Sequence, residues 1–337
     1  MRISLILGAV FLAIPLFITS CTDQPNPAAT QTLTSTPTLI PIPHPTLTLT
    51  PTPTYAIEEI SGSFRNQISH LEDGMPRAGS EGYIVPSEKE QKDFAKLISF
   101  LSAADFGSAA PLAAQNHYRL IRYTDRGDDN AVSFLLREEK PIQRGWGLYA
   151  VRVDPTSNII IEAPHPIYDK RTPTVAMNIY RALNARALLI AGAHRNANSD
   201  GSADMAHTTE SIFHSIHVAL SEELKPTTGD LIILQIHGFH TSKHEGYPQA
   251  VFGFGKKMEG KEFTIAENLK NAFSAQGINV GLCTGDVWQD LCGTKNAQAS
   301  VANGGIFIHI ELDENLRKHD DLLVAALVQV FGNGLSP

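Results

Sequence analysis

Hydrophobic and polar residues alternate in three segments near the start of the folded part of the chain. The segment 118–123 reads Tyr-Arg-Leu-Ile-Arg-Tyr, and related patterns occupy 131–136 and 147–153. Turn-forming residues, such as the Asp-Asp-Asn run at 128–130, separate these segments. A two-residue period between turn signals is typical of strands, so this region predicts antiparallel strands. Before it, the mixed segment 57–110 contains one helical pattern, at 88–102.

Beyond residue 154 the apolar runs become continuous and alternate with helical patterns. Strands are predicted at 158–163, 187–191, 231–236, 278–282 and 305–310. Helices are predicted from 172 onward and at 209–224, 264–275 and 316–330. Strands that are apolar on both faces and alternate with amphipathic helices form mostly parallel sheets. The sequence therefore predicts an α/β fold, with a mixed, mostly parallel sheet that has helices on both faces and is preceded by short antiparallel strands.

The first 21 residues have the layout of an export signal. A positive charge at Arg2 precedes an apolar run over 3–18, which is shorter than the roughly 20 residues of a transmembrane helix. The run ends in Ile-Thr-Ser-Cys at 18–21, which resembles the lipobox of bacterial lipoproteins. We expect a lipoprotein anchored by lipidated Cys21 and held outside the cytoplasm, at the cell surface or in the periplasm. The alternatives are ordinary cleavage that leaves a free cysteine, and retention of the run as an anchor.

A Thr/Pro-rich segment, residues 22–56, follows the expected lipidation site. Proline blocks helices and strand ladders, and the segment has too little apolar surface to offset the cost of ordering it. We expect an extended tether in front of one folded domain, 57–337, with an N-terminal portion over 57–153 and a site-bearing portion over 154–337. No other stretch of the sequence is apolar over a length that would span a membrane, so the lipid would be the sole membrane contact.

The charge of the chain bears on its binding partners, and its cysteines bear on a possible disulfide. The net charge is −8, and no Lys/Arg cluster recurs on a predicted face, which argues against nucleic acid. Cys283 and Cys292 would lie in an oxidising compartment, where a short disulfide-closed loop is expected. A metal site at this pair is the weaker alternative, because the spacing is not C-x-x-C and further sulfur ligands are lacking.

Three of the apolar strands end on histidine, at His165, His194 and His237. Ligand sites of α/β sheets lie beyond the carboxyl ends of the strands. One such histidine is more typical of packing or capping, but three at equivalent ends indicate a metal site, and catalytic zinc takes three protein ligands. The carboxylate ligand would be Asp169 or Glu162. Glu162 lies inside its strand, which favours a role in orienting a ligand histidine.

Glu311 follows the apolar residues of the strand at 305–310. A carboxylate is costly there unless it has a partner or a role. A metal hydrolase needs a carboxylate beside its bound water, as general base and then proton donor. Glu311 is the candidate for this role, and a structural ion pair with Arg195 or Arg317 is the alternative.

These motifs, in this order, resemble those of the N-formylglutamate amidohydrolases and phage poly-γ-glutamate hydrolases, relatives of the zinc carboxypeptidases. The resemblance covers roughly 155–320. It rests on Pro-His-Pro-Ile-Tyr-Asp at 164–169, Ala-His-Arg at 193–195, Gln-Ile-His-Gly-Phe at 235–239, His-Ile-Glu at 309–311 and Leu-Arg at 316–317. It implies the zinc-carboxypeptidase fold, also described as phosphorylase/hydrolase-like.

The resemblance also implies residue roles. One zinc ion would be held by His165, Asp169 and His237, and Glu311 would be the general base. Arg195 and Arg317 would hold a carboxylate of the substrate. Asp169 departs from the pattern, because the polyglutamate hydrolases carry the longer Glu there.

The chain has more histidines than a mononuclear site needs. His194 and His207 are candidates for the pocket or for orienting ligands, and Asn296 is a candidate for the cleft lining, with Thr294 and Gln298 nearby. His214 and His217, one helical turn apart near the start of a helix, could serve the pocket, but they are more typical of ordinary surface histidines.

The expected function is zinc-dependent hydrolysis of an amide bond in a peptide, a cell-wall fragment or a γ-glutamyl compound. A rival hypothesis is a tethered lipoprotein that captures metal or ligand without turnover. A third is a degenerate hydrolase fold kept for protein contacts, which predicts no stoichiometric metal.

Overall fold

The computed structural model describes residues 57–141, 144–224, 231–256, 258–284, 287–302 and 304–332. They belong to one compact unit, Pro53–Pro337. The expected signal peptide, its Cys21 and the tether lie outside the described residues. In the ranges given, none of the helices combines the length and the apolar character needed to cross a membrane.

A mixed sheet runs through the described part of the chain, with ten strands in the order β1-β2-β3-β4-β6-β5-β7-β10-β8-β9. Its central strands β6, β5, β7 and β10 are parallel, whereas β2, β3 and β4 form the predicted antiparallel segment. The fold class predicted from the sequence is therefore confirmed. The strands are β1 (Glu58–Gly62), β2 (Tyr118–Asp125), β3 (Ala131–Glu138), β4 (Leu148–Arg152), β5 (Ile159–Ala163), β6 (Ala187–Ile190), β7 (Ile232–Gly238), β8 (Ala250–Gly253), β9 (Val280–Leu282) and β10 (Ile306–Leu312).

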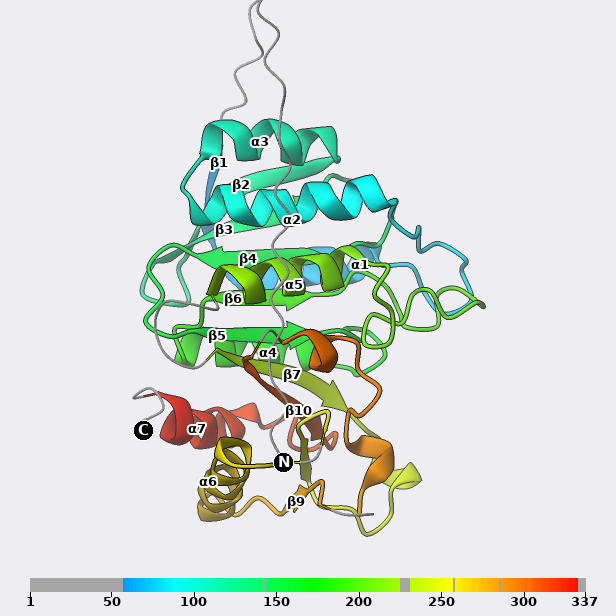
Figure 1. The fold of residues 1–337 in the computed structure, drawn as a ribbon, viewed down its shortest axis with the longest axis vertical. Coiled ribbons are helices and arrows are strands. Elements are labelled where there is room, and N and C mark those ends of the chain that lie inside the picture. Colours follow the sequence, from blue (N-terminus) through cyan, green and yellow to red (C-terminus); the bar gives the residue numbers. More distant parts are fainter. Residues whose placement is uncertain are drawn as a thin grey trace, which may run out of the picture. The chain divides into compact units, whose positions relative to one another are not determined.

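Helices cover both faces of this sheet and bury two cores (Figure 1). One face carries α1 (Phe64–Gly74), α4 (Thr172–Ala182), α6 (Lys261–Ala275) and α7 (Asp320–Phe331). The other face carries α2 (Glu88–Ser102), α3 (Phe106–Gln115) and α5 (Ile212–Leu224). Apolar residues of β7 alternate between the two cores, which is why this strand reads as a continuous apolar run.

Several elements were not predicted, namely β1, α1, α3 and β8. β8 is a four-residue strand, too short to show a period, and it lies antiparallel to β10. Pro111 lies inside α3, and because proline usually ends a helix, the sequence of this segment did not indicate one. By contrast, α2 begins with a full capping box between Ser87 and Glu90, in agreement with the predicted start of that helix.

The register of the central strands places polar residues side by side. Glu162 of β5 pairs with Gln235 of β7, which pairs in turn with His309 of β10. Two residues further along β7 and β10, His237 pairs with Glu311. Residues two positions earlier in these strands belong to the core under α2, α3 and α5, so the polar side chains project toward that same face.

Candidate metal centre

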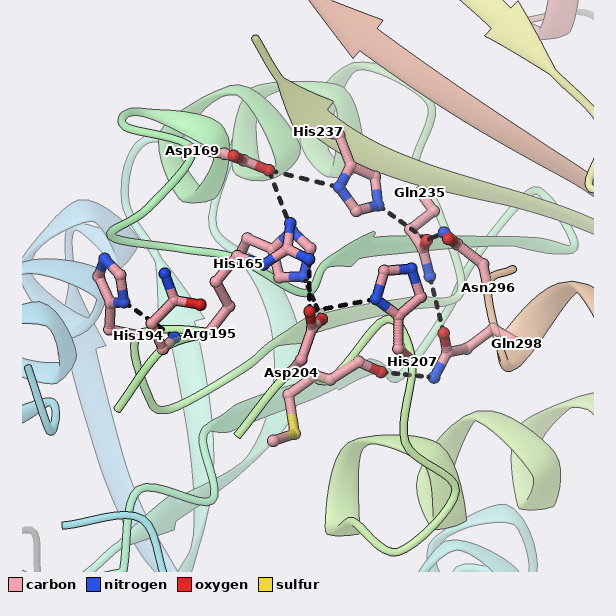
Figure 2. Close-up of polar contacts among 12 residues, drawn as sticks. His165, Asp169, His194, Arg195, Asp204, His207, Gln235, His237, Asn296 and Gln298 are labelled. Carbon is pink, nitrogen blue, oxygen red and sulfur yellow. Dashed lines mark hydrogen bonds and ion pairs between the residues drawn. The ribbon is translucent and has the colours of Figure 1, made fainter. Parts of the chain in front are cut away.

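Three side chains converge at the carboxyl ends of the parallel strands. His165 follows β5, His237 lies near the end of β7, and Asp169 lies in the turn before α4. Nδ1 of each histidine is 3.3 Å from Oδ2 of Asp169, and all three residues are buried (Figure 2). Two imidazole nitrogens and one carboxylate oxygen at this separation make a donor set suited to one zinc-like ion.

The second nitrogen of each histidine points away from Asp169 to a hydrogen-bond acceptor. Nε2 of His165 lies 2.8 Å from Oδ1 of Asp204, and Nε2 of His237 lies 2.9 Å from Oε1 of Gln235. Metal-ligating histidines usually donate their other N–H in this way, which fixes the tautomer and the ring orientation. The arrangement leaves the Nδ1 lone pair of both rings directed toward Asp169.

A buried carboxylate determines which way Gln235 is oriented. Nε2 of Gln235 donates to Oε2 of Glu162 at 3.0 Å, and the other oxygen of Glu162 lies 2.7 Å from Nδ1 of His217. Glu162 accepts in this contact, so the amide nitrogen of Gln235 faces Glu162. Its oxygen must then face His237, which therefore donates from Nε2. Glu162 thus acts on His237 through one intervening side chain.

Asn296 links Gln235 to His309, which contacts the candidate base Glu311. Its Nδ2 donates to Oε1 of Gln235 and lies 3.2 Å from Nδ1 of His309. His309 therefore accepts at Nδ1 and donates from Nε2 to Oε1 of Glu311, 3.2 Å away. Oε2 of Glu311 is buried and has no hydrogen-bond partner among the described residues. An unpaired buried carboxylate oxygen is costly, so it marks a position where a ligand or a proton is expected.

His237, His309 and Glu311 form a second group of potential metal ligands. The two groups share His237, and its Nε2 carries the hydrogen donated to Gln235. One lone pair is left, at Nδ1, so the shared ring can serve one ion. The geometry therefore describes one centre, with His309 and Glu311 at its border.

Electrostatics at the centre separates the roles of its carboxyl groups. Burial acts to raise the pKa of Asp169, but its contacts with His165 and His237 outweigh this effect and lower that pKa. Burial also raises the pKa of Glu311, and there the contact with His309 only reduces the effect. Asp169 is thus held as an anion, whereas Glu311 accepts a proton more readily than an ordinary glutamate.

The pKa values of the two histidines move in opposite directions. Burial and the neighbouring His309 lower the pKa of His237 well below its ordinary value, which keeps the ring neutral. Burial lowers the pKa of His165 as well, but Asp169 and Asp204 together outweigh it and raise that pKa. Because a metal ion binds the neutral ring, the raised pKa of His165 means that a lower pH should weaken metal binding.

A cavity of about 390 Å³ opens over the centre. It brings together several residues singled out in the sequence, including Arg195, His207 and Asn296. Arg195 is ion-paired with Asp204, which also bonds His165 and His207 (Figure 2). The lining is His165, Arg195, Ala206, His207, His237, Gln289, Asp290, Gly293, Thr294, Lys295, Asn296, His309 and Glu311.

Other candidates lie elsewhere. Half-buried His194 does not line the cavity, and its ring packs against Tyr168. Arg317 is also absent from the lining; it is buried, and its Nη1 donates to the carbonyl oxygen of Leu312. The expectation that it reaches the substrate cleft is therefore not met.

The prediction that His214 and His217 are surface histidines is wrong. Both are buried, because the side of α5 that carries them packs against the sheet face from which Glu162 projects. Nδ1 of His214 lies 3.4 Å from Nε2 of Gln298. The two rings thus belong to the polar network beneath the centre.

Three residues of the site were assigned no role in the sequence, namely Asp204, Gln235 and His309. Two of them had a visible signal, since polar residues recur every second position at the ends of β7 and β10. Asp204 had none, because it lies in an irregular segment between β6 and α5 whose path depends on tertiary packing.

The expected disulfide joins Cys283 and Cys292. It closes the loop that immediately precedes the cavity residues Gly293, Thr294 and Lys295. The crosslink thus anchors one wall of the cavity to the region of β9.

No model of a known protein family matches the sequence, and no curated protein matches it. Among solved structures, the chain resembles N-formylglutamate amidohydrolase from Ralstonia eutropha JMP134 at 12% identity and a TM-score of 0.36, covering 55% of this chain and 97% of that one. A bacteriophage poly-gamma-glutamate hydrolase matches at 12% identity and 0.35, covering 54% and 86%. A metallo-carboxypeptidase from Burkholderia cenocepacia matches at 13% identity and 0.35, covering 63% of each chain. At these values the likeness says nothing about activity, which has to be argued from the site.

Proposed function

We propose that this protein is an exported, lipid-anchored hydrolase of amide bonds that uses one zinc ion. The observation that carries the proposal is the convergence of His165, Asp169 and His237 at a cavity that is also lined by Glu311, a carboxylate with an unpaired oxygen. Ligands alone would serve a binding protein equally well. A hydrolase needs in addition a carboxylate near the ligands, and Glu311 lines the same cavity as the two ligand histidines.

The donor set fits zinc, because zinc accepts imidazole nitrogen and carboxylate oxygen together and catalytic sites use three protein ligands. When bound, zinc would supply Lewis-acid polarisation of the scissile carbonyl and a lowered pKa for the attacking water. Glu311 would take the proton of that water at Oε2 and pass it to the departing nitrogen. His309 contacts the other oxygen, Oε1, and leaves Oε2 without a partner among the described residues.

The cavity favours a substrate with an anionic group near the scissile bond. Lys295 and Arg195 both line it, together with the acidic Asp290 and Glu311. Arg195 is already engaged by Asp204, so Lys295 is the candidate contact for a substrate carboxylate. A peptide, a cell-wall stem fragment and a γ-glutamyl compound all carry such a group.

Metal content is the first test. We expect about one zinc per chain by elemental analysis of the purified protein after zinc loading and dialysis. The double variant His165→Ala/His237→Ala should retain none. A protein that stays metal-free after loading would refute the mechanism proposed here.

The variant Glu311→Gln separates a hydrolase from a metal-capturing protein. It keeps the shape of the side chain but removes the proton acceptor, so zinc content should stay at the wild-type level. Hydrolysis of a panel of N-acyl amino acids and γ-glutamyl peptides should fall by at least about 100-fold. Undiminished hydrolysis in Glu311→Gln would remove Glu311 from the mechanism, whereas a zinc-loaded wild type that cleaves none of the panel would favour the binding function.

A further inference from the structure

A second pocket, of about 500 Å³, lies outside the metal cavity and shares no lining residue with it. Two basic dipeptides from distant parts of the sequence meet there. Lys170 and Arg171 precede α4, and Arg317 and Lys318 precede α7. The remaining lining residues are His240, Thr241, Glu314 and Asn315. A protein with a net charge of −8 thus concentrates four cations around one hollow.

Arg317 is the central observation. It is only 2% exposed, it has no ion-pair partner among the described residues, and its Nε is buried without a hydrogen bond. The contact of Nη1 with the carbonyl oxygen of Leu312 satisfies part of the guanidinium. Removing a cation from water without a paired anion is costly. Burial lowers the pKa of Arg317, and the carboxylates of Asp169, Glu311, Glu314 and Asp313 act to raise it, but no ion pair joins any of them to Arg317. A buried guanidinium that lines a pocket and has no direct anionic partner among the described residues indicates that the pocket receives an anion.

The position of Arg317 is built into the backbone. A Cβ at residue 238 would lie 1.5 Å from Nη1, so only glycine leaves room for the guanidinium. The carbonyl oxygen of Arg317 accepts a hydrogen bond of 2.8 Å from Nε of Arg171. The two basic dipeptides are therefore fixed to each other rather than meeting by chance on a flexible surface.

Glu314, the carboxylate in the lining, makes its direct contacts with His240 and Thr241 rather than with the four cations. Glu314 is engaged by His240 and by the backbone nitrogen and hydroxyl of Thr241. Arg171, the residue before α4, adopts a left-handed backbone with φ of 74° and provides no side-chain cap for that helix. The N-terminal end of α4 therefore adds its own partial positive charge to the pocket.

We propose that this second pocket binds an oxyanion, either a carboxylate or a phosphate. Arg317 and Arg171 would provide planar donors, and Lys170 and Lys318 would add charge at the rim. The site needs no metal. The proposal is independent of the proposed hydrolase, because this pocket shares no lining residue with the metal cavity.

The test titrates the purified full-length chain, without added metal, with inorganic phosphate and separately with glutarate. Calorimetry gives the affinity, and the ¹⁵N–¹H signal of the Arg317 Nε group reports the place of binding. We expect saturable binding of at least one probe, with a shift of the Arg317 signal. The exposed double variant Lys170→Gln/Lys318→Gln should bind about tenfold or more weakly. The double variant Lys89→Gln/Lys270→Gln removes the same charge elsewhere and should bind like the wild type.

Saturation by glutarate alone would identify a carboxylate site, and saturation by phosphate alone a phosphate site. The proposal is overturned if neither probe saturates, or if both double variants weaken binding equally. Zinc content measured on the same variants keeps the two proposals apart. A metal-free protein that binds the oxyanion refutes only the hydrolase, and a zinc-loaded protein that binds no oxyanion refutes only this pocket.

Discussion

At the scale of single residues, the proton positions at the centre depend on Glu162, a fully buried residue that belongs to neither the metal group nor the cavity lining. Glu162 accepts from the amide nitrogen of Gln235, which orients Gln235, and Gln235 then fixes the tautomer of His237. Asn296 carries the same constraint to His309 and so to Glu311. If Glu162 became an amide, either orientation of Gln235 would be satisfied.

The variant Glu162→Gln should therefore weaken zinc binding by about 10- to 100-fold. The affinity is measured by competition with a chelator, and imidazole ¹⁵N shifts should show His237 losing its single tautomer. Tyr180→Phe is the control, because it removes a buried hydrogen bond of 2.7 Å to Ser133 on the other side of the sheet. Unchanged zinc affinity in Glu162→Gln would contradict the relay.

His214 makes stability depend on pH. Burial and the neighbouring His217 lower its pKa from 6.5 to about 4. Between these values the unfolded chain binds a proton that the folded chain does not, so stability is full above about pH 6.5 and falls as the pH drops toward 4. The loss from this residue is at most about 3 kcal/mol. Urea unfolding of His214→Asn should show a smaller loss than the wild type over this window, and parallel pH profiles would contradict the assignment.

At the scale of elements, the parts readable from the sequence are those in which one strand or helix carries its own pattern. The apolar runs of β5, β6 and β7 were visible because both faces of a central strand are buried. Their histidine ends were readable for the same reason, since parallel strands bring their carboxyl ends to one edge. Asp204 and the second pocket were not, because both depend on segments far apart in sequence meeting in space.

The end of β7 gives a prediction at this scale. Gly238→Ala places a methyl group where Nη1 of Arg317 lies, at 1.5 Å, so the guanidinium or the strand has to move. We expect the free energy of unfolding in urea to fall by about 2 kcal/mol or more. Gly107→Ala in α3 is the matched control, because its new Cβ meets nothing nearer than 3.7 Å and alanine favours a helix. Equal stability of the two variants would show that Arg317 is not held as described.

At the scale of the whole molecule, the sheet joins the segments that the sequence divided. The portions 57–153 and 154–337 contribute neighbouring strands, β4 and β6, to one sheet, and each core draws residues from both. The catalytic proposal therefore concerns the compact unit as a whole. Where that unit works is a separate question, which rests on the first 56 residues of the sequence.

Lipidation at Cys21 is the prediction that tests whether the protein is anchored to a membrane. Acyl chains contribute about 0.8 kcal/mol per buried CH₂ group, and two or more chains hold a protein stably on a membrane. The wild-type chain, expressed in a bacterium, should incorporate labelled palmitate and enter the detergent-rich phase of a phase-separating detergent. Cys21→Ser should lose the label and move to the aqueous phase, whereas Cys283→Ser/Cys292→Ser should keep it, because those sulfurs are joined to each other. The opposite outcome is that neither the wild type nor Cys21→Ser incorporates palmitate, while both remain in the membrane. The apolar run at 3–18 would then itself be the anchor, and the lipoprotein hypothesis would be wrong.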